Sequence, residues 1–117
     1  MPSSELNRPL SEVKADLFKA LGHPARIRAL EVLAEGERTV GDLQTHVGIE
    51  SSHLSQQLGV LRRAGLVVTR KEGSSVYYAL ADPLVAELLA VAKKFLLASL
   101  TQTKGLLDDL TAEVNAR

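Results

Sequence analysis

The sequence predicts a mainly α-helical fold with one small β-hairpin, and a single stretch carries most of this prediction. From Glu50 to Leu80 the chain reads ESSHLSQQLGVLRRAGLVVTRKEGSSVYYAL. Leu54, Leu58 and Leu61 recur at the spacing of one helix face, which must be buried. Two runs rich in β-branched and aromatic residues follow, separated by a glycine-containing tip, and they indicate a hairpin. A helix followed by such a hairpin predicts a winged helix-turn-helix.

The helix in this stretch carries small hydrogen-bonding groups on the face opposite its leucines. Ser51 or Ser52 is expected to cap its start, and Ala64-Gly65 to end it. It would then span roughly fifteen residues, or about 22 Å at about 1.5 Å per residue. A helix of that size fits the major groove of DNA.

Composition limits the functions open to the chain. Its 117 residues suit one domain and 45% are apolar, although a domain this small buries only about two-thirds of its unfolded surface. Without cysteine it forms no disulfide and holds no metal through thiolates. No apolar run reaches the roughly 18 residues of a membrane span, and residues 1–10 lack a signal-peptide pattern. We therefore expect a cytoplasmic protein with no membrane contact.

The formal net charge of zero and the sequence pI of about 6.8 argue against DNA binding, because DNA-binding domains often have a pI above about 9. The distribution of charge answers part of this objection. Between residues 60 and 75 the chain carries four cations and one acid, a local charge of +3. These residues are Arg62, Arg63, Arg70, Lys71 and Glu72.

Helix signals precede the central stretch. Residues 1–9 are expected to form a flexible arm, and residues 10–117 the winged helix-turn-helix domain. The first helix is predicted from Leu10, with Ser11 as its cap, to a stop at Gly22.

Two further helices lead into the predicted recognition helix. The second begins at His23-Pro24, with proline at its first position, and ends at Gly36. Thr39 caps a short third helix through about His46, and Gly48 supplies the turn that completes the helix-turn-helix pair. The inward-facing residues of the second helix are predicted to be Ile27, Leu30, Leu33 and Ala34.

The last helix, about residues 83–115, is predicted to join two copies of the chain. Asp82 caps it, Pro83 opens it, and Gly105 is a point at which it could bend or break. Its apolar residues recur at alternating four and three residues, which is a heptad-like seam too long for so small a core. With the first helix it would form a dimer layer that places two recognition helices about one DNA turn apart. The predicted dimerisation residues are Leu10, Val13, Leu17, Leu84, Leu88, Val91 and Phe95. A monomer whose last helix wraps its own core is the alternative.

Three blocks of sequence occur in a definite order and spacing. They are FKALGHPARIRAL at 18–30, SHLSQQL and LRRAGLV at 52–67, and GSSVYY at 73–78. Together they resemble the ArsR/SmtB family of winged-helix repressors, and the similarity runs from about Val13 to Leu97. The resemblance implies a homodimeric bacterial repressor that binds an inverted-repeat operator and leaves it when an effector binds.

The chain departs from this family at its metal sites. Thiolate-type sensors carry a cysteine pair where residues 39–43 read TVGDL. Zinc-type sensors carry an Asp-x-His pair, of which Asp82 matches the first member while Leu84 replaces the histidine. Two DNA contacts are also weaker than the family pattern, because Gly59 and Ser74 stand at positions that are often basic.

No cofactor is assigned with certainty, although a divalent metal at a non-standard site remains open. His23 is expected to cap or pack, and His46 to lie at a helix C-terminus, where a cation is favoured. The candidate metal ligands are His23, His46 and Asp82.

The predicted DNA contacts divide by role. Short or planar polar groups on the recognition helix suit base edges, and Gln56 could hold adenine through a bidentate pair. The four cations are expected to contact phosphates, which set affinity and register without reading sequence. The full set is Thr39, Gln44, Ser51, Ser52, His53, Ser55, Gln56, Arg62, Arg63, Arg70, Lys71 and Ser74. The alternative is an ordinary solvated polar face.

The motifs contain no catalytic constellation, so an enzyme is not expected. The sequence instead predicts a dimeric DNA-binding transcriptional repressor whose partner is double-stranded operator DNA. Two alternatives remain open. The winged helix could serve as a protein-interaction module, or the regulator could depend on a separate sensor protein.

Overall fold

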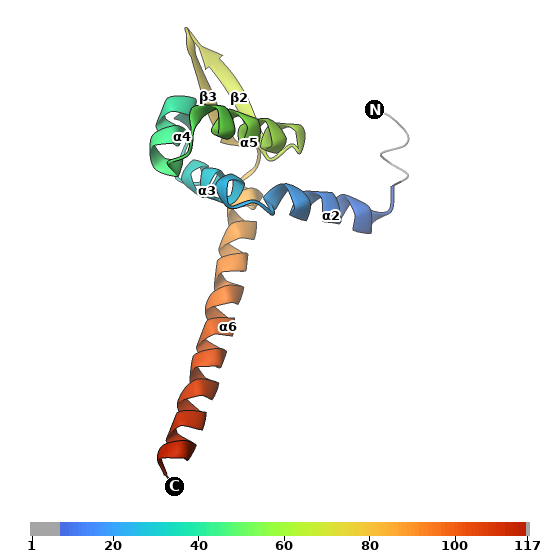
Figure 1. The fold of residues 1–117 in the computed structure, drawn as a ribbon. Helices are drawn as coiled ribbons and strands as arrows, with labels where there is room; N and C mark the ends of the chain where they lie inside the picture. Colours follow the sequence, from blue (N-terminus) through green and yellow to red (C-terminus); the bar gives the residue numbers. More distant parts are fainter. Residues whose placement is uncertain (1–7, 117) are drawn as a thin grey trace. The chain divides into compact units, whose positions relative to one another are not determined.

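The computed structural model describes residues 8–116, and it is mainly helical with one small antiparallel sheet (Figure 1). The predicted winged helix-turn-helix is confirmed. The chain divides into two compact units, with the boundary inside the last helix after Ala86. In chain order the elements are α2 (Leu10–Leu21), α3 (Pro24–Leu33), β1 (Arg38–Thr39), α4 (Val40–Val47), α5 (Ser51–Arg63), β2 (Val67–Glu72), β3 (Ser75–Leu80) and α6 (Pro83–Asn115).

Helix α2 begins at Leu10 as predicted, but Ser11 does not cap it. Pro9 occupies the N-cap position, and no side chain caps the helix. The Pro9 carbonyl accepts from the amides of Glu12 (3.0 Å) and Val13 (3.3 Å), so Ser11 lies within the first turn. Of the predicted arm, residues 1–7 lie outside the described part of the chain.

Helix α3 begins as the sequence predicts. The His23 ring accepts through Nδ1 from the amide of Ala25 at 3.1 Å, and Pro24 is the first helical residue. The helix ends at Leu33, three residues before Gly36. Ala34 was predicted to face inward but is exposed, because it already lies at the C-cap.

The helix-turn-helix pair consists of α4 and α5. Thr39 caps α4 by accepting from the amide of Asp42 at 3.3 Å, and Gly48 ends the helix with a φ of 74°, a left-handed conformation that favours glycine. Neither serine caps α5. Glu50 takes the N-cap position without a side-chain bond, and the Ser52 hydroxyl instead donates to the Glu50 carboxylate at 2.9 Å. Helix α5 has 13 residues, slightly fewer than predicted.

The core lies where α3, α4 and α5 pack together beside the sheet (Figure 1). Burying these aliphatic side chains provides the main driving force for folding of this unit. The largest fully buried side chains are Leu30, Leu43, Leu54, Leu58, Leu61, Val47 and Val67. They include the three leucines from which the recognition helix was predicted.

The sheet contains the predicted hairpin and one strand that the sequence did not indicate. Strands β2 and β3 pair antiparallel, with Thr69 opposite Tyr78, and β1 pairs with the other edge of β3. Gly73 has a φ of 62° in the two-residue tip, a conformation that side chains other than glycine rarely adopt. The two residues of β1 are too few to show a strand periodicity.

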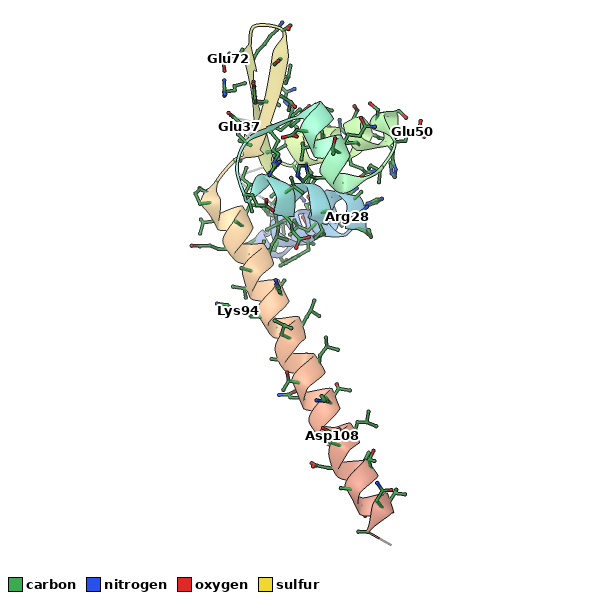
Figure 2. All side chains as sticks on the ribbon, turned by 90° about the vertical axis from the view of Figure 1, so that its left-hand side faces the viewer. Arg28, Glu37, Glu50, Glu72, Lys94 and Asp108 are labelled. Atoms are coloured by element: carbon green, nitrogen blue, oxygen red, sulfur yellow. The ribbon has the colours of Figure 1, made fainter. Side chains whose placement is uncertain are left out.

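Helix α6 is one continuous helix of 33 residues, and it passes through Gly105 without a break. Asp82 caps it as predicted, since its Oδ1 accepts from the amide of Leu84 at 2.8 Å. Side chains project from all sides of α6, as the labelled Lys94 and Asp108 illustrate (Figure 2). Among the helices of residues 8–116, none combines the length and the hydrophobicity that a membrane span requires.

Candidate nucleic-acid interface

Helix α5 has one polar exposed face and one buried face. Its apolar face is fixed by Leu54, Leu58 and Leu61, none of which is measurably exposed. Because this face is buried, the side chains predicted to read bases lie on the exposed side of the helix. The exposed predicted contacts on α5 are Ser51, Ser52, His53, Ser55, Gln56, Arg62 and Arg63.

Gly59 gives the exposed face of α5 its shape. A Cβ atom added at Gly59 would lie 3.2 Å from Nη1 of Arg63. The guanidinium group therefore lies back over the helix at the position where a larger residue would crowd it. The Arg63 guanidinium, from four residues later in the helix, therefore occupies the space beside Gly59.

Gln57 is a buried polar neighbour of the exposed face that the sequence analysis did not single out. It is 7% exposed, whereas the adjacent Gln56 is exposed. Its Oε1 accepts from Nη1 of Arg26 at 2.7 Å. The hydrogen bond explains how a polar side chain is tolerated among the leucines of α5. Its position on the leucine side of α5 was the only available signal.

Two predicted contacts from α4 and its cap already have structural roles. Thr39 is the N-cap of α4, and the Gln44 amide donates to the Ile49 carbonyl at 3.4 Å across the helix-turn-helix turn. Both side chains are half-buried. They stabilise the turn that orients α5, and their contact with DNA stays a prediction.

In the wing, which we define as β2 and β3, Arg70 is held between two carboxylates. Its Nε donates to Glu37 at 2.7 Å and its Nη1 donates to Glu72 at 2.6 Å. Its guanidinium carbon lies 4.5 Å from the centre of the Tyr77 ring, which is a cation–π contact. Glu37 and Glu72 lie along the same side of the hairpin (Figure 2). Arg70 therefore reaches a phosphate only by sharing or leaving these partners.

The Arg70 cluster also perturbs the acidity of its members. The hydrogen bond from Arg70 lowers the pKa of Glu37 from its ordinary value of 4.5. The same bond, together with the one to Glu72, raises the pKa of Arg70. The net charge of the three groups is −1, so the positive charge predicted for the wing is reduced. Lys71 and Ser74 are both exposed there, and Lys71 forms no ion pair within residues 8–116.

The histidines have separate surroundings. The rings of His23 and His53 meet edge to face, with 5.8 Å between their centres, at the N-terminal ends of α3 and α5. His46 lies 2.9 Å from the Asp42 carbonyl through Nδ1 and 3.3 Å from Nη1 of Arg38 through Nε2.

The candidate metal ligands do not form a cluster. Each of His23, His46 and Asp82 has a local partner, since His23 and Asp82 both cap helices and His46 contacts Arg38. In the part of the chain that the structure describes, no three histidine or carboxylate side chains gather as metal ligands would.

Most of the predicted dimerisation residues lie on open surface. In α2, Leu10 is 66% exposed and Val13 42%, while Leu17 is half-buried. Phe18, which the sequence analysis did not include, is 58% exposed. Of the predicted dimerisation residues in α6, Leu84, Val91 and Phe95 are exposed, whereas Leu88 is half-buried.

Comparison with known proteins places this architecture in a family. Residues 23–69 match the model described as bacterial regulatory protein, arsR family. The HTH-type transcriptional regulator Rv0081 of Mycobacterium tuberculosis is 54% identical over 107 residues, which cover 91% of this chain and 94% of that protein. The biofilm growth-associated repressor of Agrobacterium fabrum is 44% identical over 76% of this chain and 75% of its own length.

Solved structures agree with these matches. The crystal structure of Rv0081 superposes with a TM-score of 0.76 and 56% identity, covering 82% of this chain and 97% of that one. A homodimeric winged helix-turn-helix DNA-binding domain of Mycobacterium bovis gives a TM-score of 0.73 at 34% identity. The superposition covers 80% of this chain and 86% of that one.

The polar exposed face of α5, the hairpin and these relatives lead to one assignment. The family regulates transcription by binding DNA and does not consist of enzymes. The chain belongs to the ArsR family of bacterial DNA-binding transcriptional regulators.

Proposed function

We propose that the protein is a homodimeric repressor that binds an inverted-repeat operator. The exposed polar face of α5 is the observation that carries this proposal, because buried leucines on its other side leave it no alternative orientation. An α-helix with such a face reads base edges in the major groove. As a DNA-bound regulator it would act in the bacterial cytoplasm.

Two copies are needed for this mode of binding. Helices α2 and α6 carry exposed apolar residues, among them Leu10, Phe18, Val91 and Phe95. Pairing two copies through these residues would remove apolar surface from water and present two recognition helices. The homodimeric Mycobacterium bovis domain supports this arrangement by similarity.

Within each copy, base reading and phosphate binding fall to different side chains. We assign base reading to Gln56 together with Ser52 and Ser55, and phosphate binding to Arg62, Arg63 and Lys71. Arg70 is a weaker phosphate ligand because Glu37 and Glu72 already bind it. With about three phosphates neutralised per copy, log K would fall against log salt with a slope of about −5.

The operator is the first experimental target. Duplexes would be selected from a random-sequence pool with the wild-type protein and then compared with scrambled duplexes by fluorescence anisotropy at about 0.15 M salt. We expect an enriched inverted repeat that is bound at least about a thousandfold more tightly than the scrambled DNA. Equal binding to both would contradict the repressor and favour the protein-interaction module.

Two substitutions test the division of roles. Gln56→Ala should relax sequence preference at one position of each half-site, because alanine cannot form the bidentate hydrogen bonds to a base. Arg63→Ala should weaken binding to all duplexes alike and flatten the salt slope by about one unit for each phosphate that is no longer neutralised. Equal losses of affinity on selected and scrambled DNA in both variants would contradict this division.

The repressor also needs a signal that releases it from the operator. A divalent cation or a separate sensor protein would fill this role. A cation would have to displace the local partners of His23, His46 or Asp82, which do not cluster in the described residues. Adding Zn²⁺, Ni²⁺ or Co²⁺ to the protein–operator complex, with a chelator as the control, distinguishes the two. Release by one metal favours a metal site, and unchanged binding favours a sensor protein.

A further inference from the structure

One arginine joins the end of α2 to the buried side of the recognition helix. Arg26 lies on α3 and spreads its guanidinium group over two neighbouring helices. Its Nε donates to the Ala20 carbonyl at 2.6 Å and its Nη2 to the Lys19 carbonyl at 3.0 Å. Its Nη1 donates to Oε1 of Gln57 at 2.7 Å. Three donors of one rigid plane therefore fix α2 and α5 relative to each other.

The groups that Arg26 binds on α2 and on α5 are both good hydrogen-bond acceptors for its guanidinium group. The last carbonyls of α2 lack α-helical partners, and the Arg26 cation binds those of Lys19 and Ala20 at the negative end of the helix dipole. The Lys19 carbonyl also accepts from the Gly22 amide at 3.1 Å. At the other end, Gln57 is 7% exposed and accepts this bond from the buried side of α5. Hydrogen bonds from a charged donor to such groups are among the stronger ones in proteins.

A second contact runs parallel to the first. The rings of His23 and His53 meet one turn away from the pair formed by Arg26 and Gln57, on the same two helices. The start of α3 is therefore in register with the start of α5 over one full turn.

The two helices joined by Arg26 face different partners. Helix α2 exposes apolar residues on its surface, including Phe18, the residue before Lys19. Helix α5 exposes Gln56 beside the buried Gln57. A change in the position of α2 would therefore be transmitted to the exposed face of α5 through Arg26 and Gln57.

We propose that Arg26 and Gln57 couple pairing of two copies through α2 to DNA binding through α5. This inference rests on the proposed homodimeric repressor. Arg26 and Gln57 are positioning residues, since neither needs to touch DNA or the second copy. Coupling between two binding events is reciprocal, so DNA must change the affinity of the two copies by the same factor as pairing changes the affinity for DNA.

The test uses full-length protein and a half-site duplex taken from one arm of the selected inverted repeat. Such a duplex binds one copy and cannot bridge two. The dimer dissociation constant is measured by sedimentation velocity, with and without saturating half-site DNA. For the wild type we expect the half-site to tighten the dimer by about fivefold or more, at the lower end of typical coupling.

Substitutions separate coupling from simple stability. Arg26→Lys keeps the charge but cannot reach three acceptors, and Gln57→Met keeps the volume but removes the acceptor. Both should reduce the half-site effect to less than about twofold. Gln57→Glu keeps an acceptor for Arg26 and should retain the effect. Thermal unfolding verifies that each variant is folded, and if Gln57→Met is not, Arg26→Lys decides.

Arg28→Lys is the matched control, because the same exchange is made two residues away on α3. Arg28 is exposed and its side chain forms no hydrogen bond or ion pair within the described residues (Figure 2). It should leave the half-site effect unchanged. A wild-type dimer insensitive to half-site DNA, or an effect of full size in Arg26→Lys, would overturn the coupling alone. Failure to select any duplex, or a monomeric wild type, would overturn the proposed function with it.

Discussion

The helix-turn-helix body and helix α6 use similar aliphatic residues for opposite purposes. In the body, Leu30, Leu54 and Leu58 have no measurable exposure, whereas Leu100 and Val114 of α6 are 66% and 70% exposed. The body buries its leucines against its own neighbouring helices. Helix α6 is held by its internal hydrogen bonds and leaves its apolar side chains exposed. An exposed apolar surface of this kind is typical of an interaction site, and in the proposed repressor a second copy covers it.

Replacing a leucine by alanine should give the largest difference between the two regions in the free energy of unfolding. Leu58→Ala should lower the free energy of unfolding by about 2–5 kcal/mol, because it leaves a cavity in a filled core. Leu100→Ala should change it by less than about 0.5 kcal/mol in dilute protein, since Leu100 is 66% exposed. Urea unfolding with a body-specific probe measures both. Equal losses of stability would show that the two regions do not differ in this way.

A charge placed on α6 tests whether its apolar surface has a partner. Phe95→Asp should weaken the dimer by at least about a hundredfold, because a carboxylate would be buried without a partner. Lys94→Asp places the same carboxylate one residue away and should have a much smaller effect. Sedimentation velocity over a dilution series measures both constants. An unchanged dimer in Phe95→Asp would mean that the pairing surface lies elsewhere.

Helix caps within the body predict a smaller contrast. Thr39→Ala should cost about 1 kcal/mol, because Thr39 accepts from the Asp42 amide. Ser51→Ala should cost less than about 0.5 kcal/mol, because no side chain caps α5. Chemical denaturation of the two variants in parallel measures both free energies of unfolding. A larger loss of stability for Ser51→Ala than for Thr39→Ala would contradict the structure.

The wing provides the smallest expected effect. Arg70→Gln should raise the pKa of Glu37, because the hydrogen bond that lowers it is removed. In the wild type the Glu37 contribution to stability is present above its ordinary pKa of 4.5 and is lost as pH falls through the lowered folded value. Carboxyl NMR titration of both proteins measures the shift. An identical Glu37 titration would exclude the ion pair in solution.

Local patterns predicted the elements, but contacts between distant residues had to come from the structure. Leucine spacing located α5, and Thr39, His23 and Asp82 cap their helices as expected, because these signals act within a few residues. The capping role of Ser51 or Ser52 was wrong, because Glu50 already occupies the N-cap.

In the candidate site, too, the sequence predicted local features but not the contacts between distant residues. The outward direction of the polar residues on α5 follows from its period, which the sequence contains. The partners of Arg70 and Gln57 do not follow from it. Glu37 lies 33 residues from Arg70, and Arg26 lies 31 residues from Gln57. Only the packed fold brings these pairs together.

Gly105 makes the local stability of α6 differ between its two ends. The helix continues through this residue, and a Cβ atom there would meet nothing within 4 Å. Glycine within a helix costs about 0.5–1 kcal/mol relative to alanine, so the hydrogen-bond ladder is weakest at this point. Fraying from the C-terminus should therefore reach Gly105 more readily than it passes into the preceding turns. Amide protons after Gly105 should accordingly exchange with solvent faster than those before it, as a separate small unit.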